Sequence, residues 1–462
     1  MRRTHAMPIN TVSTAIEPPL SEAAAEAWIP RTCFKNGPPS QIGVELELLV
    51  VDARHPDGLA AHYPGHRRPA LLRDLAAGGL DGQLTVEPGG QVELSSRPGP
   101  SVARTIAVVR QDLAALRTRA ARSGARLVGI GVDPIRPPIR VGDQPRYAAM
   151  EQYFDGWGPA GRIMMCSTAS VQVNVEAGVW PAPDTVPPGT AVARSPGGTP
   201  PLQGIRQRWD LLHAVGPALV AAFANSPRCA GRPTGWKSTR QAVWTRLDPA
   251  RTGVPPTGRS EDLEAAFTRW ALDAPLLLVR RDHGPWSAPA GVSFRQWLRL
   301  GRGVIPDRRP PTTDDLEYHL TTLFPQVRPR GHLEVRYIDA QPGGWWTVPP
   351  AVITALLDDA TAADRARAAC EATEGRWQDA ARVGMEDAEL AGAATRLLEI
   401  AATALRETPD HSWLAGQVEG YLERWTARGR CPADDPLAGV AGLSSVHTNG
   451  TWGLSRHEPT TK

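Results

Sequence analysis

The chain of 462 residues is long enough for one large domain or for two to three ordinary ones, and 41% of its residues are hydrophobic. Its formal net charge of +3 is close to neutral for this length, and only three of its 51 Lys and Arg residues are lysines. Because acidic residues balance the arginines throughout, the composition argues against a nucleic-acid-binding protein and favours a globular one.

The sequence also disfavours membrane proteins and disulfide-linked proteins. No apolar run approaches the length of a membrane span, and the first ten residues lack the apolar core of a signal peptide. The five cysteines are odd in number and have no CxxC spacing, which argues against a zinc site and against a disulfide framework. We therefore expect a cytoplasmic protein that binds neither membranes nor nucleic acid.

The N-terminal part shows little pattern before the first strand. Residues 1–20 are polar and lack periodicity, whereas 21–29 predict a helix with Ser21 as its N-cap. We expect 1–30 to be a poorly ordered N-terminus with a lead-in helix, followed by a single domain over 31–428.

The stretch IGVELELLV, residues 42–50, predicts a strand that carries two carboxylates. Glu45 and Glu47 are two residues apart, so on a strand they project from one face, while the apolar residues line the other. Two like charges on a buried strand repel each other, and desolvation disfavours both. Such an arrangement persists where a metal ion or an arginine cluster compensates the charge.

A second pair of carboxylates lies in LTVEPGGQVELSS, residues 84–96. The pattern predicts two strands joined as a hairpin across the Pro-Gly-Gly sequence, with Glu87 at the end of the first strand and Glu93 within the second. A surface hairpin with ordinary exposed acids is the alternative interpretation.

Three longer segments follow. Residues 100–124 predict an amphipathic helix, and 126–134 predict a buried strand. Residues 162–178 predict the most regular strand, with valines on one face and Gln172 and Asn174 on the other. Alternation alone does not decide whether the polar face lies in water or forms a cavity wall.

The middle of the chain contains a low-complexity stretch and a basic, aromatic one. Residues 180–204 are rich in Pro, Gly, Ala and Thr and predict a mobile loop. Residues 236–253 hold Trp236, Arg240 and Arg246 in a short span. They form either a surface loop or a basic, aromatic-lined pocket for an anionic ligand.

The C-terminal part combines one more charged strand with helices. Glu334 and Arg336 share a face of a strand predicted over 330–342, either as an ion pair at a sheet edge or as part of a site. Residues 349–428 predict a helical layer that supports the sheet, and 429–462 a C-terminal tail.

Glutamate is disfavoured in strands, so its repeated placement there needs an explanation. The residues concerned are Glu45, Glu47, Glu87, Glu93 and Glu334. Oxygen ligands without His or Cys suit Mg²⁺ or Mn²⁺, and several carboxylates suit more than one ion bridging a nucleoside triphosphate. With Arg336, Arg240 and Arg246 balancing negative charge, the pattern predicts a phosphoryl-transfer site on an antiparallel sheet.

Five motifs, in this order, carry a resemblance to a known family. They are IGVELELLV, TVEPGGQVELSS, MMCSTASVQVNVE, STRQAVWTRLDPARTG and HLEVRYIDAQPGGWW. Together they resemble the plant and proteobacterial type of glutamate–cysteine ligase, especially its actinobacterial branch in ergothioneine biosynthesis, which RTCFKNGPP upstream also resembles. The resemblance runs from about Arg31 to beyond Trp346.

The resemblance implies an α+β, glutamine-synthetase-like catalytic domain, in which an antiparallel β-sheet funnel surrounded by helices holds ATP and metal ions. It also implies a reaction in which ATP, L-glutamate and L-cysteine yield γ-glutamylcysteine, ADP and phosphate. In that family the γ-carboxylate attacks the γ-phosphate of ATP, giving a γ-glutamyl phosphate, and the cysteine amine then displaces phosphate.

Residue by residue, the resemblance implies three groups of site residues. The metal ligands are Glu45, Glu47, Glu93 and Glu334. The catalytic residues are Arg336, near the transferred phosphate, and Glu87, which is a ligand or orients one. The substrate- and nucleotide-binding residues are Gln172, Asn174, Trp236, Arg240 and Arg246.

Some features depart from the pattern of that family or leave alternatives open. Cys33 and Cys229 are not spaced as the plant redox switch requires, so we expect no disulfide regulation. A sister carboxylate–amine ligase that joins glutamate to a different amine, or a non-catalytic nucleotide-binding protein, would share the scaffold. We expect a monomer that uses Mg²⁺ or Mn²⁺ and takes ATP, L-glutamate and L-cysteine as substrates.

Overall fold

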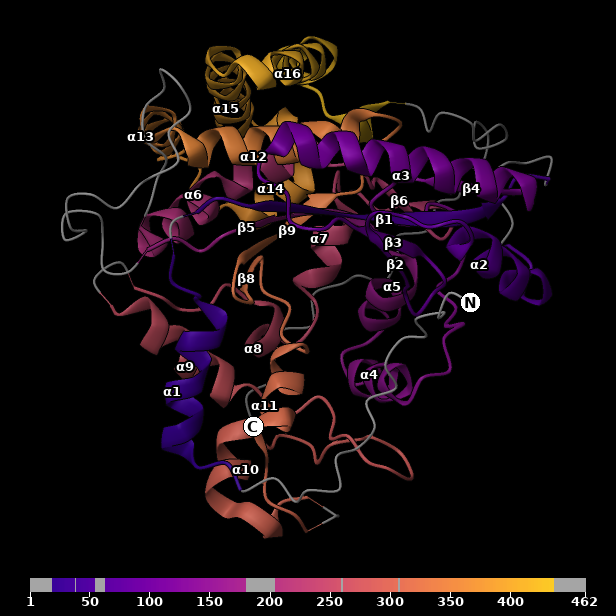
Figure 1. Ribbon diagram of the computed structural model, residues 1–462, viewed down its shortest axis with the longest axis vertical. Helices are drawn as coiled ribbons and strands as arrows, with labels where there is room; N and C mark the ends of the chain where they lie inside the picture. The colour runs from indigo at the N-terminus through magenta and orange to yellow at the C-terminus, as the bar shows by residue number, and fades with distance from the viewer. Residues whose placement is uncertain are drawn as a thin grey trace, which may run out of the picture.

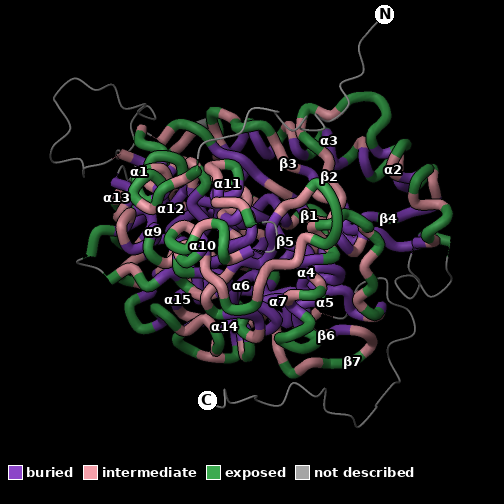
Figure 2. The backbone as a smooth tube through the Cα atoms, turned by 90° about the horizontal axis from the view of Figure 1, so that it is seen from below, coloured by how far each residue is buried: buried purple, intermediate pink, exposed green. Residues whose placement is uncertain are grey.

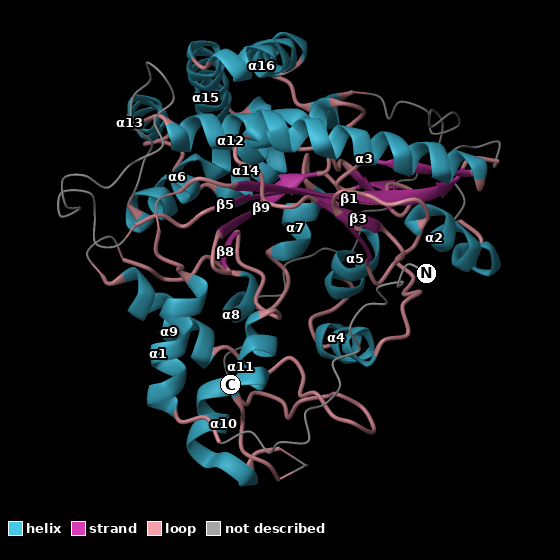
Figure 3. Ribbon diagram, viewed as in Figure 1, coloured by secondary structure: helices cyan, strands magenta, loops and turns pink. Residues whose placement is uncertain are grey.

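The computed structural model describes residues 19–37, 39–54, 63–179, 204–258, 261–305 and 308–435. These residues form an α+β structure around one seven-stranded sheet, with helices on both of its faces (Figures 1 and 3). The strand order is β2-β3-β1-β5-β9-β8, with β4 paired to the far end of β1, and every pairing is antiparallel. The expected α+β fold with an antiparallel sheet surrounded by helices is confirmed.

The strands of the main sheet come from the whole length of the described chain. They are β1 (Ile42–Asp52), β2 (Gln83–Val86), β3 (Val92–Ser95), β4 (Ala125–Val128), β5 (Ser170–Val175), β8 (Val327–Pro329) and β9 (Leu333–Asp339). A separate two-stranded sheet consists of β6 (Arg228–Cys229) and β7 (Arg232–Pro233). The central position of β1 explains its burial, since of its eleven residues only Glu45 and Glu47 are not buried.

One face of the sheet supports a stack of helices (Figure 1). They are α3 (Val102–Arg122), α12 (Val348–Asp358), α13 (Ala360–Ala369), α15 (Ala388–Glu407) and α16 (Ser412–Arg424). The first ten residues of α12 are all buried, which fits a helix enclosed between the sheet and the outer helices. The buried helix α6 (Ile205–Phe223) packs against β9 and α15, and α14 (Trp377–Val383) packs against α6.

Helices of at most 12 residues lie on the opposite face (Figure 3). They are α1 (Glu22–Cys33), α4 (Pro145–Asp155), α5 (Ala160–Ser167), α7 (Thr239–Trp244), α8 (Pro249–Thr252), α9 (Leu263–Asp273), α10 (Phe294–Leu300) and α11 (Thr313–Leu320), with α2 (Arg68–Ala76) near the sheet edge. The centre of the molecule, at β5, α6 and α7, is buried, whereas α10 has exposed residues on the outside (Figure 2).

Several local predictions are confirmed by the structure. The side chain of Ser21 caps α1 by accepting a hydrogen bond from the backbone N–H of Ala24. The side chain of Ser101 caps α3 in the same way, through the N–H of Arg104. The hairpin across the Pro-Gly-Gly sequence is present as β2 and β3, with Gly90 at a φ of +85°.

Two predicted strands are much shorter than expected. The predicted strand 162–178 is wrong over its first part, because residues up to Ser167 belong to α5 and only Ser170–Val175 form β5. The methionine-rich start of this stretch carries no alternation, and its apolar side chains are buried in a helix instead. Of the strand predicted over 126–134, only the part in β4 is extended in the sheet.

Other predictions fall outside the described residues or remain expectations. Most of the expected disordered start and nearly all of the expected mobile loop at 180–204 lie outside the described ranges. The domain boundaries stay predictions. Residues 431–435 of the expected tail pack back on the core, where the N–H of Ala433 donates to the carbonyl of Ala224 at 3.0 Å. Among the described helices, none is both long and apolar enough to cross a membrane.

Candidate active site

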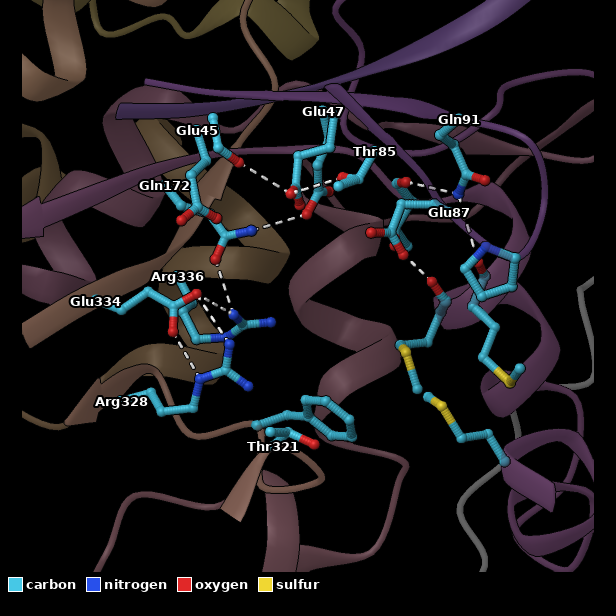
Figure 4. A pocket seen from close by; sticks show the side chains of 18 of the residues that line it. Glu45, Glu47, Thr85, Glu87, Gln91, Gln172, Thr321, Arg328, Glu334 and Arg336 are labelled. Atoms are coloured by element: carbon cyan, nitrogen blue, oxygen red, sulfur yellow. Dashed lines mark hydrogen bonds and ion pairs between the residues drawn. The ribbon is translucent and has the colours of Figure 1, made fainter. Parts of the chain in front are cut away.

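A cavity of about 540 Å³ opens on the face of the sheet that carries the short helices, because α4, α5 and α7 supply part of its lining. Its lining residues come from β1, the β2–β3 hairpin, β5, the β8–β9 hairpin, and from α4, α5 and α7. Figure 4 shows side chains from these elements pointing toward one another. Strands far apart in the sequence therefore present their polar faces to one shared space.

Four carboxylates occupy one side of this cavity. Register places Glu47 directly opposite Glu93 on the neighbouring strand, an arrangement that is unfavourable for two like charges. Glu45 projects from the same strand face as Glu47, and Glu87 stands at the end of β2 beside the hairpin turn. The alternative interpretation, a surface hairpin with ordinary exposed acids, is therefore wrong for Glu87 and Glu93, because both line the cavity.

Amide and hydroxyl groups hold three of these carboxylates in place. Glu45 accepts a hydrogen bond from the Asn174 amide at 2.8 Å, and Glu47 accepts one from the Gln172 amide at 2.8 Å. Glu93 accepts from the hydroxyls of Thr85 and Ser95, each at 3.0 Å. These donors fix the oxygens without neutralising the charge.

Burial and mutual repulsion disfavour the charged forms of these carboxylates. Burial raises the pKa of Glu45 to about 7, with repulsion from Glu334 and Glu93 adding to the effect. Burial likewise raises the pKa of Glu87 to about 8, helped by Glu47 and Glu93. The pKa of Glu93 is raised by burial and by Glu47. A cation placed among them would relieve this cost.

On the opposite side of the cavity, two arginine side chains are already paired with a carboxylate. Glu334 is fully buried and receives two hydrogen bonds from Arg328, at 2.6 and 3.0 Å, and one from Arg336 at 2.7 Å. Burial alone would raise the pKa of Glu334, but the two guanidinium groups hold it well below its usual value. Glu334 is thus the stabilised anion of an arginine cluster.

Gln172 connects the two sides (Figure 4). Its amide N–H donates to Glu47, and its carbonyl oxygen accepts from the Arg336 guanidinium at 2.8 Å. Gln172 therefore belongs to the cavity wall, and Asn174 is bonded to a carboxylate of that wall, so this part of the polar face of β5 forms a cavity wall.

The residues present fit a divalent cation on the acidic side. Carboxylate oxygens with no competing His or Cys are the donors that Mg²⁺ and Mn²⁺ prefer. The raised pKa values of Glu45 and Glu87 show that their charged forms lack a compensating cation. The described residues contain no group of three or more His, Cys, Asp or Glu side chains already arranged to hold an ion, so water and substrate oxygens would complete the coordination. Glu334 differs, because both of its oxygens are taken by arginines.

Most of the predicted site residues are brought together by the fold. The cavity is lined by Glu45, Glu47, Glu87, Glu93, Gln172, Arg240, Glu334 and Arg336. Asn174 reaches it through its hydrogen bond to Glu45. Arg240 is buried and donates to the carbonyl of Arg336 at 2.8 Å, while its Nε and Nη1 have no hydrogen-bond partner among the described residues. Two of the predicted residues, Trp236 and Arg246, do not line the cavity; the Arg246 guanidinium lies 5.4 Å from the Trp236 ring centre instead.

Several cavity residues were not identified from the sequence. They are Gln83, Thr85, Pro88, Gln91, Ser95, Arg146, Tyr147, Met150, Met164, Met165, Thr168, Trp244, Thr321, Phe324, Arg328, Arg330 and His332. A signal existed for Arg328, since the hairpin of β8 and β9 pairs it across the strands with Glu334. The residues of α4 and α5 carried no such signal, because only the tertiary fold brings these helices to the sheet face.

Comparison with known proteins gives a consistent result. The family model described as glutamate-cysteine ligase family 2 matches residues 41–442. The protein named glutamate–cysteine ligase EgtA from Mycobacterium tuberculosis (strain ATCC 25618 / H37Rv) is 39% identical over 453 residues, covering 94% of this chain and 94% of that protein. The EgtA protein of Mycolicibacterium smegmatis is 38% identical over 425 residues, covering 90% of each.

More distant relatives cover less of the chain or share less sequence. The chloroplastic glutamate–cysteine ligase of Brassica juncea is 32% identical over 279 residues, covering 60% of this chain and 50% of that protein. A solved structure of a glutamate–cysteine ligase from Francisella tularensis in complex with AMP aligns with a TM-score of 0.47 at 14% identity, covering 86% of this chain and 84% of that one. Since the family model matches all but the two ends of the sequence, this chain belongs to glutamate–cysteine ligase family 2.

Proposed function

We propose that this chain is an ATP-dependent ligase that joins the γ-carboxylate of L-glutamate to the amine of L-cysteine. The family membership and the two mycobacterial relatives, both named glutamate–cysteine ligase EgtA, support the reaction. We expect the γ-glutamylcysteine to enter low-molecular-weight thiol synthesis, namely that of ergothioneine. The observation that carries the proposal is the single cavity in which a carboxylate cluster faces an arginine cluster across Gln172.

The chemistry requires two successive substitutions. A γ-carboxylate oxygen of glutamate attacks the γ-phosphorus of ATP, the bond to the ADP oxygen breaks, and a γ-glutamyl phosphate forms. The neutral amine of cysteine then attacks the acyl carbon, the C–N bond forms, phosphate leaves, and the amine loses one proton. Both steps place negative charge on phosphate oxygens, so the site must neutralise that charge and align the reactants.

The side chains of the cavity match these needs. Glu45, Glu47 and Glu93 would hold Mg²⁺ or Mn²⁺, and Glu87 either ligates an ion or orients a ligand. When bound, a divalent cation supplies charge neutralisation at the phosphates of ATP. Arg336 is fixed by Glu334 and Gln172, so its remaining N–H donors are held ready for the transferred phosphoryl group.

Arg240 supplies a second fixed cation. Its two unpartnered nitrogens are buried, and a buried guanidinium without a partner is costly. A carboxylate or phosphate oxygen of a substrate would satisfy them. Roles for Trp236 and Arg246 in substrate binding stay predictions, since the two residues lie outside the cavity.

Phosphate release from ATP tests this proposal. The purified chain is incubated with ATP and Mg²⁺, with glutamate, with cysteine or with both, and the products are identified by mass spectrometry. We expect release that requires both amino acids and yields γ-glutamylcysteine. Release with glutamate and another amine but not cysteine would instead identify a sister ligase, and ATP binding without turnover would identify a non-catalytic nucleotide-binding protein.

A further inference from the structure

Arg146 differs from the other cationic residues of the cavity lining in the element that carries it. Among the described residues that line the cavity, the other cationic side chains come from α7 or from the β8–β9 segment, whereas Arg146 lies in the first turn of α4. It lies near enough to Glu87 to lower the pKa of that carboxyl slightly, against the larger raising effect of burial. Arg146 therefore adds a cation to the cavity from an element that supplies no other.

Two kinds of contact hold the Arg146 guanidinium. Its Nη1 donates to the hydroxyl of Thr321 at 2.9 Å, and its Nη2 donates to the Thr321 carbonyl at 3.1 Å. Thr321 follows the last turn of α11, where the negative end of the helix favours a cation. The guanidinium carbon also lies 5.1 Å from the centre of the Tyr318 ring, within the range of a cation–π contact.

Tyr318 is itself held from several sides. The guanidinium of Arg280 lies 4.5 Å from the same ring centre and is tied to Asp314 by an ion pair and by a hydrogen bond to its backbone carbonyl at 3.0 Å. The ring of Trp286 meets Tyr318 edge-on, with 5.9 Å between the ring centres. The half-buried Tyr318 ring, which also packs against a buried hydrophobic cluster, is fixed in this way and offers Arg146 a rigid surface.

The surroundings of Arg146 indicate what it could bind. A guanidinium has five N–H donors, and Thr321 takes two of those of Arg146. Beside it the cavity wall is apolar, formed by Tyr147, Met150 and Phe324. A carboxylate attached to a small, weakly polar side chain matches this combination of a cation and an apolar wall.

We propose that Tyr318 is a positioning residue, whose ring holds Arg146 at the cavity wall so that Arg146 receives the carboxylate of the acceptor amino acid. The inference rests on the proposed ligase function and deepens it, because it assigns recognition of the acceptor's carboxylate. It predicts that amines lacking a carboxylate gain nothing from the Tyr318–Arg146 contact.

Steady-state kinetics with L-cysteine and with cysteamine, which lacks the carboxylate, test this inference. Tyr318→Leu should raise the KM for cysteine roughly three- to thirtyfold, the loss expected for a partly desolvated cation–π contact. The KM values for ATP, glutamate and cysteamine should stay within about twofold of the wild type for a pure positioning role. Tyr318→Phe, which keeps the ring, should restore the cysteine KM.

A double-mutant cycle shows whether Tyr318 acts through Arg146. Arg146→Met should raise the KM for cysteine but not for cysteamine, and adding Tyr318→Leu to it should cause no further rise. Trp413→Leu is the matched control, because Trp413 forms a similar pair with Arg110, at 4.5 Å, between α3 and α16, outside the cavity lining. It should leave every KM unchanged.

The outcomes separate this inference from the proposed function. A wild type that ligates no acceptor contradicts both. If the wild type ligates cysteine, two results contradict only the role of Tyr318. One is an equal rise in the KM for cysteine and for cysteamine in Tyr318→Leu. The other is additive effects of Tyr318→Leu and Arg146→Met on the KM for cysteine. Should Tyr318→Leu not fold, fluorinated phenylalanines at position 318 keep the ring shape while weakening its negative face. The cysteine KM should then rise with each added fluorine, and a flat series would contradict the inference.

Discussion

At the residue scale, Glu334 shows how the site combines stability with chemistry. It is a fully buried carboxylate whose desolvation is offset by Arg328 and Arg336. The sequence-based expectation of a metal ligand stays a prediction, and the structure adds a second role as the anchor of two arginines. Removing its charge should therefore affect folding as well as turnover.

Glu334→Gln should lower the free energy of unfolding by about 3–5 kcal/mol, because it leaves two buried guanidinium groups without their anion. Turnover should fall at least tenfold, since Arg336 loses its anchor. Urea unfolding and steady-state kinetics measure the two effects. Glu419→Gln is the control: its pair with Arg406 is exposed, so we expect a change within about 1 kcal/mol. A Gln variant as stable as the wild type would contradict the anchoring role.

The same residue predicts a dependence of stability on pH. The folded-state pKa of Glu334 is held below its unfolded value of about 4.3, so its contribution is complete above that pH and is lost as the pH falls toward the folded-state value. The difference in unfolding free energy between wild type and Glu334→Gln should therefore narrow below about pH 4. A difference in unfolding free energy that stays constant down to pH 3 would contradict a lowered folded-state pKa for Glu334.

At the element scale, the turn between β2 and β3 positions Glu87 by docking on α5. A Cβ atom at Gly89 would lie 2.1 Å from the carbonyl oxygen of Cys166 and 2.5 Å from its Cα, so only glycine allows this approach. The Gln91 amide secures the turn by donating to the carbonyl of Thr168 at 2.9 Å.

Gly89→Ala should push the turn off α5, cost about 1–3 kcal/mol of stability and reduce turnover strongly by moving Glu87. Thermal unfolding and kinetic assays give the two quantities. Gly392→Ala serves as the control, since a Cβ there meets nothing within 4 Å and alanine favours the helix. Full activity of Gly89→Ala would show that Glu87 does not need this turn.

The segment between Val179 and Gly204 has its two ends side by side. These residues form a parallel β-bridge, and the N–H of Ile205 donates to the carbonyl of Val179 at 3.2 Å. A short linker can therefore join the ends without moving α6. Replacing residues 181–201 with a short Gly-Ser linker should leave the melting temperature and the turnover of ATP measurable and close to those of the wild type. A folded deletion variant without any turnover would show that the segment contributes to the site.

Elements with a strong local signal were predictable from the sequence, and those fixed by tertiary contacts were not. The alternation of residues predicted the strands β1 and β3 and the face on which their carboxylates lie. Ser101 as an N-cap predicted the start of helix α3. Helix α5 was not predicted, and its residues from 162 on were assigned to a strand, because a short apolar run suits a helix and a strand equally well. Arg146 gave no local signal at all, since its role depends on contacts with residues far along the chain.

At the scale of the whole molecule, the sheet separates support from chemistry. Helices α3, α12, α15 and α16 cover one face of the sheet (Figure 1). The other face carries polar side chains into the cavity. This sheet can hold four carboxylates near one another despite their repulsion, because pairing with neighbouring strands fixes the strands that carry them. The monomeric state and the cytoplasmic location stay predictions.

The central claim is that this cavity activates the γ-carboxylate of glutamate as an acyl phosphate. The most direct measurement uses glutamate labelled with ¹⁸O in both γ-carboxylate oxygens, together with ATP, Mg²⁺ and cysteine, and follows the label by mass spectrometry. We predict one ¹⁸O atom in each released phosphate and one in the γ-glutamyl amide. Unlabelled phosphate, released while γ-glutamylcysteine forms, would contradict the γ-glutamyl phosphate and the account of the site built on it.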